Sequence, residues 1–117
     1  MSVRQRKVAS LIQETLGSIF LEKIRDPELG LVTITDVKVT PDLKIAKIYI
    51  SVYQKDKREY ALEHIESMKG VLRSELAHRV NLRSTPELKF FIDDTYDYIE
   101  KIDKIFENIK NDNHEKE

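Results

Sequence analysis

The sequence predicts an α+β fold in which one small mixed sheet carries helices on one face. Three observations lead to this prediction. Apolar residues recur at helical spacing in several segments, two neighbouring segments rich in β-branched residues are separated by a proline-containing turn, and a third such segment follows the central helical region. With 117 residues, the chain is long enough for one domain with one core.

The first helix is predicted over residues 2–24. Its apolar residues recur every three or four positions: Val8, Ile12, Leu16, Ile19 and Phe20. Ser2 is a suitable N-cap, because a serine hydroxyl accepts a hydrogen bond from a free N–H group of the first turn. Asp26 and Pro27 end the helix, because proline disfavours helical geometry in the residue before it.

Residues 31–40 and 45–53 are predicted to pair as a two-stranded hairpin. The apolar alternation of the first strand changes phase between Thr35 and Asp36, which indicates a bulge or a twist in the strand. The turn contains Pro41, whose ring presets the backbone. The second strand is rich in isoleucine, valine and tyrosine, the residue types that favour strands.

Two helices and a third strand are predicted to follow the hairpin. Helical periodicity extends over residues 56–81, where Ser67 and Gly70 interrupt it, so we predict a structural kink at these two residues. A short strand covers residues 88–92. The predicted order is therefore helix, strand, strand, helix, kink, helix, strand, and then a last helix.

The last helix is predicted over residues 96–109. Its apolar residues share one face: Ile99, Ile102, Ile105, Phe106 and Ile109. We expect this face to pack on the body of the protein. Residues 111–117 contain no apolar side chain and are expected to form a disordered polar tail, which leaves residues 1–110 as the single domain.

The charge of the chain is unevenly distributed along the sequence. Residues 1–92 hold 16 Lys and Arg against 12 Asp and Glu, whereas residues 93–117 hold 4 against 9. The body is therefore basic and the C-terminal segment acidic. A basic body indicates an anionic partner such as nucleic acid, although a mixed solvated surface has a similar composition.

The residues that common catalytic and metal sites require are missing from the sequence. The chain has no cysteine, and its three histidines, at positions 64, 78 and 114, have no metal-ligand spacing. No glycine-rich phosphate loop occurs. We therefore expect no enzyme activity, no cofactor and no metal. No segment is long and apolar enough to cross a bilayer, so we expect a cytoplasmic protein that does not bind membranes.

Several motifs resemble the ribosome-binding factor A family. These are DPELG at residues 26–30, VTITDV at 32–37, DLKIAKIYISV at 42–52, KGVLRSEL at 69–76, TPEL at 85–88 and FFID at 90–93. Their order and spacing agree with that family from residue 4 to about residue 109. The resemblance implies a single type II KH-like domain that lacks the Gly-x-x-Gly loop with which ordinary KH modules clamp nucleic acid. The junction between the two central helices offers only Gly70.

The resemblance also implies a function. Members of this family bind the small ribosomal subunit and its rRNA during late maturation and rRNA processing, are important in cold adaptation, and are released with the help of an assembly GTPase. We expect the same partners here, for a protein that acts as a monomer. The alternative is a protein-only interaction module without direct RNA contact.

The candidate RNA-binding residues are basic and belong to two groups. The first helix and its end contribute Arg4, Arg6, Lys7, Lys23 and Arg25. The kink and the helix after it contribute Lys69, Arg73, Arg79 and Arg83. Such side chains neutralise phosphates, but each one alone is equally consistent with an ordinary solubilising charge. Four aromatic residues of the strands are assigned to the core rather than to base stacking: Tyr49, Tyr53, Phe90 and Phe91.

Overall fold

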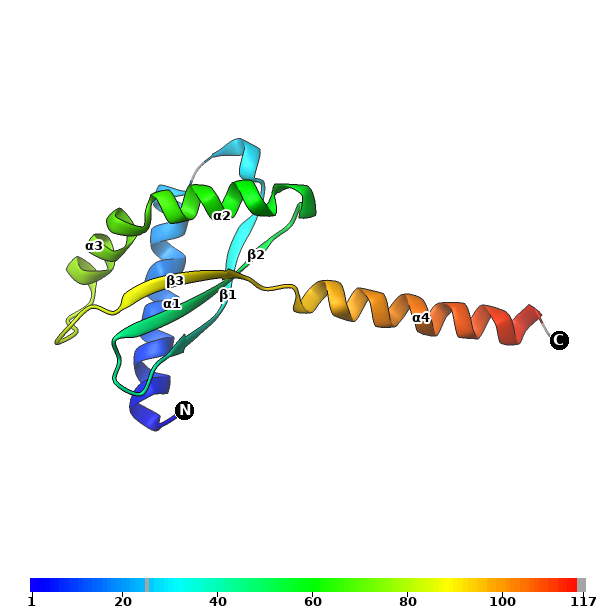
Figure 1. The fold of residues 1–117 in the computed structure, drawn as a ribbon, viewed down its shortest axis with the longest axis horizontal. Helices are drawn as coiled ribbons and strands as arrows, with labels where there is room; N and C mark the ends of the chain where they lie inside the picture. The colour runs from blue at the N-terminus through cyan, green and yellow to red at the C-terminus, as the bar shows by residue number, and fades with distance from the viewer. Residues whose placement is uncertain (25, 116–117) are drawn as a thin grey trace.

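The computed structural model describes residues 1–24 and 26–115 of the chain. The elements are α1 (Val3–Lys23), β1 (Val32–Val39), β2 (Ile45–Val52), α2 (Arg58–Ser67), α3 (Lys69–Arg79), β3 (Glu87–Ile92) and α4 (Thr95–Glu115) (Figure 1). Short 3-10 turns at Pro27–Leu29 and Lys55–Lys57 precede β1 and α2. The α+β class and the order of the elements are as predicted.

The sheet is mixed and has the strand order β1-β2-β3. Strands β1 and β2 are antiparallel, with a register shift between Ile34 and Asp36, so both the hairpin and its bulge were predicted correctly. Strand β3 is parallel to β2 and pairs Glu87 with Ile45. A parallel neighbour needs a long crossover, which α2 and α3 provide.

Helix α1 begins with a capping box. The Gln5 backbone N–H donates to Ser2 Oγ (3.2 Å), and the Ser2 backbone N–H donates to Gln5 Oε1 (2.9 Å). The side-chain amide of Gln5 also donates from Nε2 to the Val39 carbonyl (2.9 Å), which fixes the start of α1 at the end of β1. The predicted N-cap, Ser2, is confirmed.

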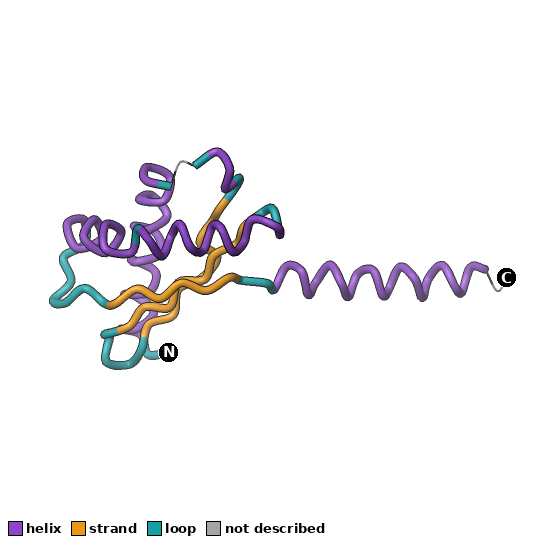
Figure 2. The backbone as a smooth tube through the Cα atoms, turned by 45° about the horizontal axis from the view of Figure 1, so that its top comes forward, coloured by secondary structure: helices purple, strands orange, loops and turns teal. Residues whose placement is uncertain are grey.

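The core lies between one face of the sheet and helices α1, α2 and α3. Alternate residues of each strand point into it, as in any sheet with one buried face. The side chains with no exposed area include those of Ile12, Leu16, Ile19, Ile48, Ile50, Ile65, Leu72, Leu76 and Leu88. Figures 1 and 2 both show these three helices gathered against the sheet. None of the described helices packs on the opposite face of the sheet.

The junction between α2 and α3 is centred on Met68, not on the glycine. Met68 leaves the α-helical region, with φ −97° and ψ 3°. Gly70 lies inside α3, its φ is not positive, and a Cβ added to it would meet no atom within 4 Å. The predicted kink exists, but assigning it to Gly70 was wrong, because a turn with negative φ is open to any residue. Ser67 contributes a hydrogen bond from Oγ to the His64 carbonyl (2.6 Å).

Helix α4 extends away from the body (Figure 2). The radius of gyration is 18.1 Å, whereas a compact chain of this length has about 13 Å. The apolar stripe that we expected to pack on the body is instead exposed along its length: Ile99, Ile102, Ile105, Phe106 and Ile109. The periodicity predicted the helix correctly, but the packing prediction was wrong, because periodicity does not specify which surface a helix meets.

Ion pairs hold the first turns of α4 to the start of α2. Arg58 contacts Asp97 (2.6 Å), and Lys55 lies 3.5 Å from both Asp97 and Glu100. The hydrogen bond from Arg58 lowers the pKa of Asp97, so the carboxylate stays charged. These contacts set the direction in which α4 leaves the body.

Residues 111–115, expected to belong to a disordered tail, continue α4. The physical reason is that neither proline nor glycine, the two strongest helix breakers, follows Pro86 in the sequence. Residues 116–117 lie outside the described part of the chain. None of the described helices is apolar over a length that would cross a bilayer.

Gly30, which follows a 3-10 turn, and Gly70, which lies inside α3, should respond differently to replacement by alanine. Gly30 has φ +66° and ψ −149°, a conformation that an L side chain rarely adopts, so Gly30→Ala should lower the free energy of unfolding by about 1 to 3 kcal/mol. Gly70→Ala should be neutral or raise it by up to about 1 kcal/mol, because alanine favours the helix. Urea unfolding measures the free energy of unfolding of both variants. A decrease in Gly70→Ala as large as the decrease in Gly30→Ala would contradict the helical conformation assigned to Gly70.

Candidate nucleic-acid interface

Three basic side chains surround one surface depression of about 520 Å³. Arg4 comes from the first turn of α1, Lys44 from the turn between β1 and β2, and Arg83 from the loop between α3 and β3. All three are exposed. We call them the Arg4–Lys44–Arg83 cluster. Residues far apart in the sequence thus form one basic surface, of which the sequence predicted Arg4 and Arg83 but not Lys44.

Lys44 is positioned by a hydrogen-bonded turn. Thr40 Oγ1 donates to Asp42 Oδ1 (2.6 Å), and the Lys44 backbone N–H donates to the same oxygen (3.1 Å). Between them, Leu43 has a positive φ of 61°. The hydrogen bond from Thr40 lowers the pKa of Asp42, which also lines the depression. The side chains that line the depression therefore carry three positive charges and one negative charge.

The loop that carries Arg83 is held by Arg73. The Arg73 guanidinium donates from Nε to the Pro86 carbonyl (3.2 Å) and from Nη2 to the Thr85 carbonyl (2.8 Å). The Glu87 backbone N–H donates to the Lys44 carbonyl (2.8 Å), which joins the loop to the hairpin turn. Arg73, predicted as an RNA contact, is therefore placed as a residue that supports the loop.

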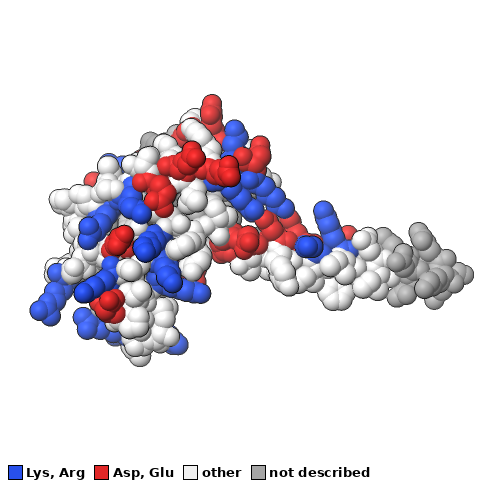
Figure 3. Space-filling view, viewed as in Figure 1, with Lys and Arg blue, Asp and Glu red and all other residues white. Residues whose placement is uncertain are grey.

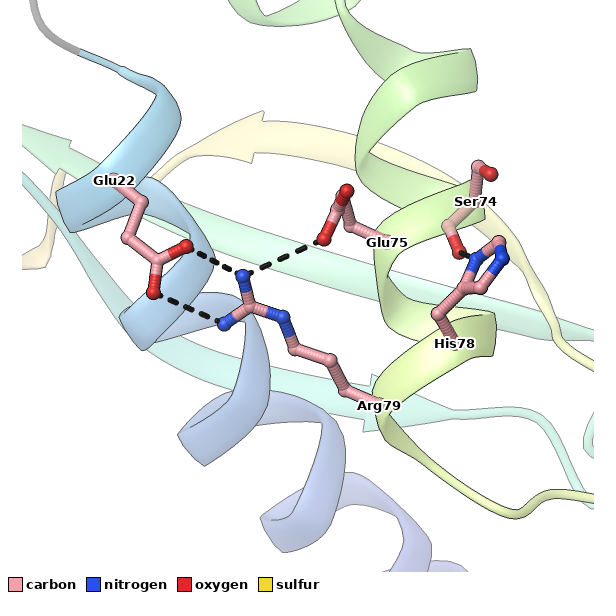
Figure 4. A network of polar contacts seen from close by, with 5 residues as sticks. All are labelled: Glu22, Ser74, Glu75, His78 and Arg79. Carbon is pink, nitrogen blue, oxygen red and sulfur yellow. Dashed lines mark hydrogen bonds and ion pairs between the residues drawn. The ribbon is translucent and has the colours of Figure 1, made fainter.

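Arg79 is engaged in a polar network between α1 and α3 (Figure 4). Its guanidinium donates from Nη1 to Glu22 (3.3 Å) and from Nη2 to both Glu22 and Glu75. The contact with Glu22 raises the pKa of Arg79. His78 lies beside the network, with Nδ1 2.7 Å from the Ser74 carbonyl. Arg79 thus joins two helices and has two carboxylates as partners, so it is a poor candidate for a phosphate contact.

The other predicted basic residues do not join the cluster. Lys69, the first residue of α3, forms an ion pair with Glu66 near the end of α2 (3.0 Å). Arg6, Lys7 and Lys23 are exposed on α1 but do not line the depression. Arg25 lies outside the described residues.

Three of the four aromatic residues assigned to the core lie elsewhere. Phe90 is buried, as predicted. Tyr49 is half-buried on the open face of the sheet, and Tyr53 and Phe91 are exposed, so the prediction was wrong for these three. The reason is the alternation of the strand, which places Phe90 and its neighbour Phe91 on opposite faces of the sheet.

Charge on the visible face of the molecule is segregated (Figure 3). Lys and Arg predominate over the part of the body that holds the strands and the hairpin turn, whereas Asp and Glu gather along α2 and where α4 begins. In the described part of the chain, no three His, Asp or Glu side chains are grouped as a metal site would require.

Comparisons with known proteins point to one family. The family model for ribosome-binding factor A matches residues 4–106. A ribosome-binding factor A from Macrococcus caseolyticus is 38% identical over 113 residues, which cover 96% of this chain and 99% of that protein. The crystal structure of ribosome-binding factor A from Thermus thermophilus superposes with a TM-score of 0.67 at 24% identity, covering 75% of this chain and 94% of that one. A second Thermus thermophilus structure, a homology model fitted into the cryo-EM map of a 30S complex with ribosome-binding factor A, gives a TM-score of 0.65 at 24% identity over 74% of this chain and 91% of that one.

The assignment of Arg73 as a supporting residue can be tested by stability. Arg73→Ala removes two hydrogen bonds from a charged donor, so the free energy of unfolding should fall by about 1 to 2 kcal/mol. Lys69→Ala is the matched control from the same helix. It removes only a surface ion pair and should change the value by less than about 0.5 kcal/mol. Equal unfolding curves for the two variants would refute the supporting role.

Proposed function

Since the chain belongs to the ribosome-binding factor A family, we propose that it binds the small ribosomal subunit during late maturation and contacts its rRNA through the Arg4–Lys44–Arg83 cluster. The observation that carries this proposal is the convergence of three exposed cations from three separate elements on one depression. The Thermus thermophilus relative placed in a 30S complex supports the choice of partner.

The chemistry of the cluster suits the phosphate backbone of RNA. Arginine presents several N–H donors in a planar fork, which matches the oxygen atoms of a phosphate group. Lysine adds a point charge on a flexible stem. Binding releases counterions from the RNA, so affinity should fall steeply with salt and depend little on base sequence.

Hydrogen bonds hold the segments that carry the three cations of the cluster in a fixed arrangement. Lys44 and the loop of Arg83 are joined by the hydrogen bond between Glu87 and the Lys44 carbonyl, and the start of α1 is joined to β1 through Gln5. The backbone segments that carry the three cations are thereby fixed relative to one another before RNA arrives. A pre-arranged set of charges loses less conformational entropy on binding than free surface lysines do.

The remaining expectations form part of the same proposal. We propose a monomeric cytoplasmic protein that takes part in rRNA processing and cold adaptation and is released with the help of an assembly GTPase. We also propose that residues 1–110 form a type II KH-like domain without a Gly-x-x-Gly loop. The element order supports this assignment, and so does the glycine content of α2 and α3, because Gly70 is their single glycine and a Gly-x-x-Gly loop needs two.

A second candidate function is a protein-only interaction module, and the exposed apolar stripe of α4 favours it. An unpaired stripe of this kind is typical of a surface that meets another protein. The two functions differ in their dependence on salt, because apolar contacts are not weakened by added salt whereas phosphate contacts are.

The cluster can be tested by measuring small-subunit binding across a salt series. The triple variant Arg4→Ala, Lys44→Ala, Arg83→Ala should bind purified small subunits more weakly. If each residue contacts one phosphate, the slope of log affinity against log salt should fall in magnitude by about 2 to 3. Circular dichroism should show an unchanged fold, because all three side chains are exposed.

The matched control replaces three exposed charges outside the cluster, in Arg6→Ala, Lys23→Ala and Lys101→Ala. This control variant should retain most of the affinity for small subunits and most of the slope of log affinity against log salt. A folded cluster variant with the affinity and slope of the parent would exclude the cluster as the rRNA contact. Salt-independent binding of the parent protein would favour the protein-only module.

A further inference from the structure

The open face of the sheet carries a row of three lysines. Register places Lys38 of β1 opposite Lys47 of β2, and Lys47 beside Lys89 of β3. All three are exposed, and within the described residues no ion pair joins any of them to a carboxylate. Neighbouring strands are about 4.8 Å apart, so the row concentrates three positive charges within about 10 Å.

Such a row is unfavourable for the free protein. Like charges directly opposite one another on paired strands lower stability, and strands gain nothing from lysine in intrinsic propensity. Threonine or valine at the same positions would suit the sheet better. An anion lying across the three strands would remove this repulsion.

Aromatic side chains adjoin the lysine row on the same face. Tyr49 and Phe91 are cross-strand neighbours whose rings stack with centroids 5.6 Å apart and an interplanar angle of 28°. Lys38 Nζ lies 5.4 Å from the centroid of the Tyr49 ring. Phe91 is 40% exposed although it is fully apolar. Residues two positions apart on a strand are about 7 Å apart, so the rings and the lysines lie within the span of one nucleotide.

Carboxylates lie around the lysine row but form no ion pair with it among the described residues. Asp36, opposite Tyr49, accepts a hydrogen bond from the Val37 backbone N–H (2.9 Å), and Glu87 lies on the far side of the row. Asp93 accepts from Thr35 Oγ1 (2.6 Å) and from the Thr95 backbone N–H (3.0 Å). The hydrogen bond from Thr35 lowers the pKa of Asp93, and the charge of Lys38 adds to this effect, so Lys38 has one carboxylate nearby. The three lysines lie side by side across the sheet and present their charges together to an anionic ligand.

We propose that this open sheet face is a second nucleic-acid contact, which takes single-stranded RNA. Phosphates lie along Lys38, Lys47 and Lys89, and an unpaired base stacks on Phe91, which Tyr49 supports. A single strand is favoured over a duplex because only splayed bases can reach an aromatic ring, whereas a duplex keeps its bases stacked on one another. The inference deepens the proposed function and rests on it for the identity of the partner as RNA.

The test measures binding of the full chain to a fluorescent single-stranded oligouridylate of about 12 nucleotides. The triple variant Lys38→Thr, Lys47→Thr, Lys89→Thr should lower the magnitude of the log-affinity against log-salt slope by about two. Its thermal midpoint should be unchanged or higher, because threonine relieves the repulsion and favours strands. The control triple, Lys57→Gln, Lys101→Gln and Lys104→Gln, removes the same charge elsewhere and should keep most of the slope.

The stacking component has its own variant. Phe91→Leu keeps an apolar side chain but removes the ring, so affinity for the oligouridylate should fall roughly 5- to 150-fold. Tyr98→Leu, on the exposed surface of α4, is the matched control and should bind as the parent does. A duplex RNA of the same length should compete poorly.

Three results would overturn the inference: no binding of the oligouridylate by the parent, an equal loss in the two lysine triples, or an unchanged affinity in Phe91→Leu. The last result would leave a surface that recognises charge alone and fits an acidic protein segment as well as RNA. Failure here is separable from failure of the proposed function. The Arg4–Lys44–Arg83 variant is assayed on whole small subunits, and it is compared with a parent that has the same open face, so the difference between their salt slopes reports on the cluster alone.

Discussion

Helices α1, α2 and α3 all pack on the same face of the sheet, and the rest of the structure depends on this one-sided burial. The chain contains no cysteine, so no disulfide supplements the packing of residues such as Ile12, Leu76 and Ile50, none of which has exposed area. The helices that complete the core also bring the start of α1 and the end of α3 to the hairpin turn. The basic depression is therefore a product of the core, because its three cations stand where those elements meet.

One-sided burial also explains why the two faces of the sheet differ in composition. The strands must be apolar on the helix side, and their remaining positions are free to carry Lys47, Tyr49 or Phe91. At the other end of the sheet, Arg58 and Asp97 direct α4 away, which leaves the open face uncovered by any described element. A helix folded back over the strands would have hidden the lysine row. The open face is therefore accessible because α4 points away from it.

Local features of the sequence were sufficient to predict the elements, but not their partners. The Ser2 cap and the bulge at Thr35 each depend on a few neighbouring residues, and both were predicted correctly. The roles of Arg73 and Arg79 depend on carbonyls and carboxylates that come close only in the folded chain, so the sequence could not separate them from free phosphate contacts. The lysine row could not be predicted from the sequence for the same reason, because the three lysines are neighbours only in the register of the three paired strands. Knowledge of that register would have placed Lys38, Lys47 and Lys89 side by side.

The parallel pairing of β2 with β3 has a consequence for how the chain folds. Ile45 and Glu87 are partners although they stand 42 positions apart in the sequence, so forming this contact costs more loop-closure entropy than forming the neighbouring hairpin. The hairpin can form early, and β2 is then an edge strand until α2, α3 and β3 have been added. An apolar edge left open in this way invites pairing with another chain. Lys47, in the middle of β2, places a charge on that temporary edge, and a charged side chain in an edge strand disfavours its pairing with another chain.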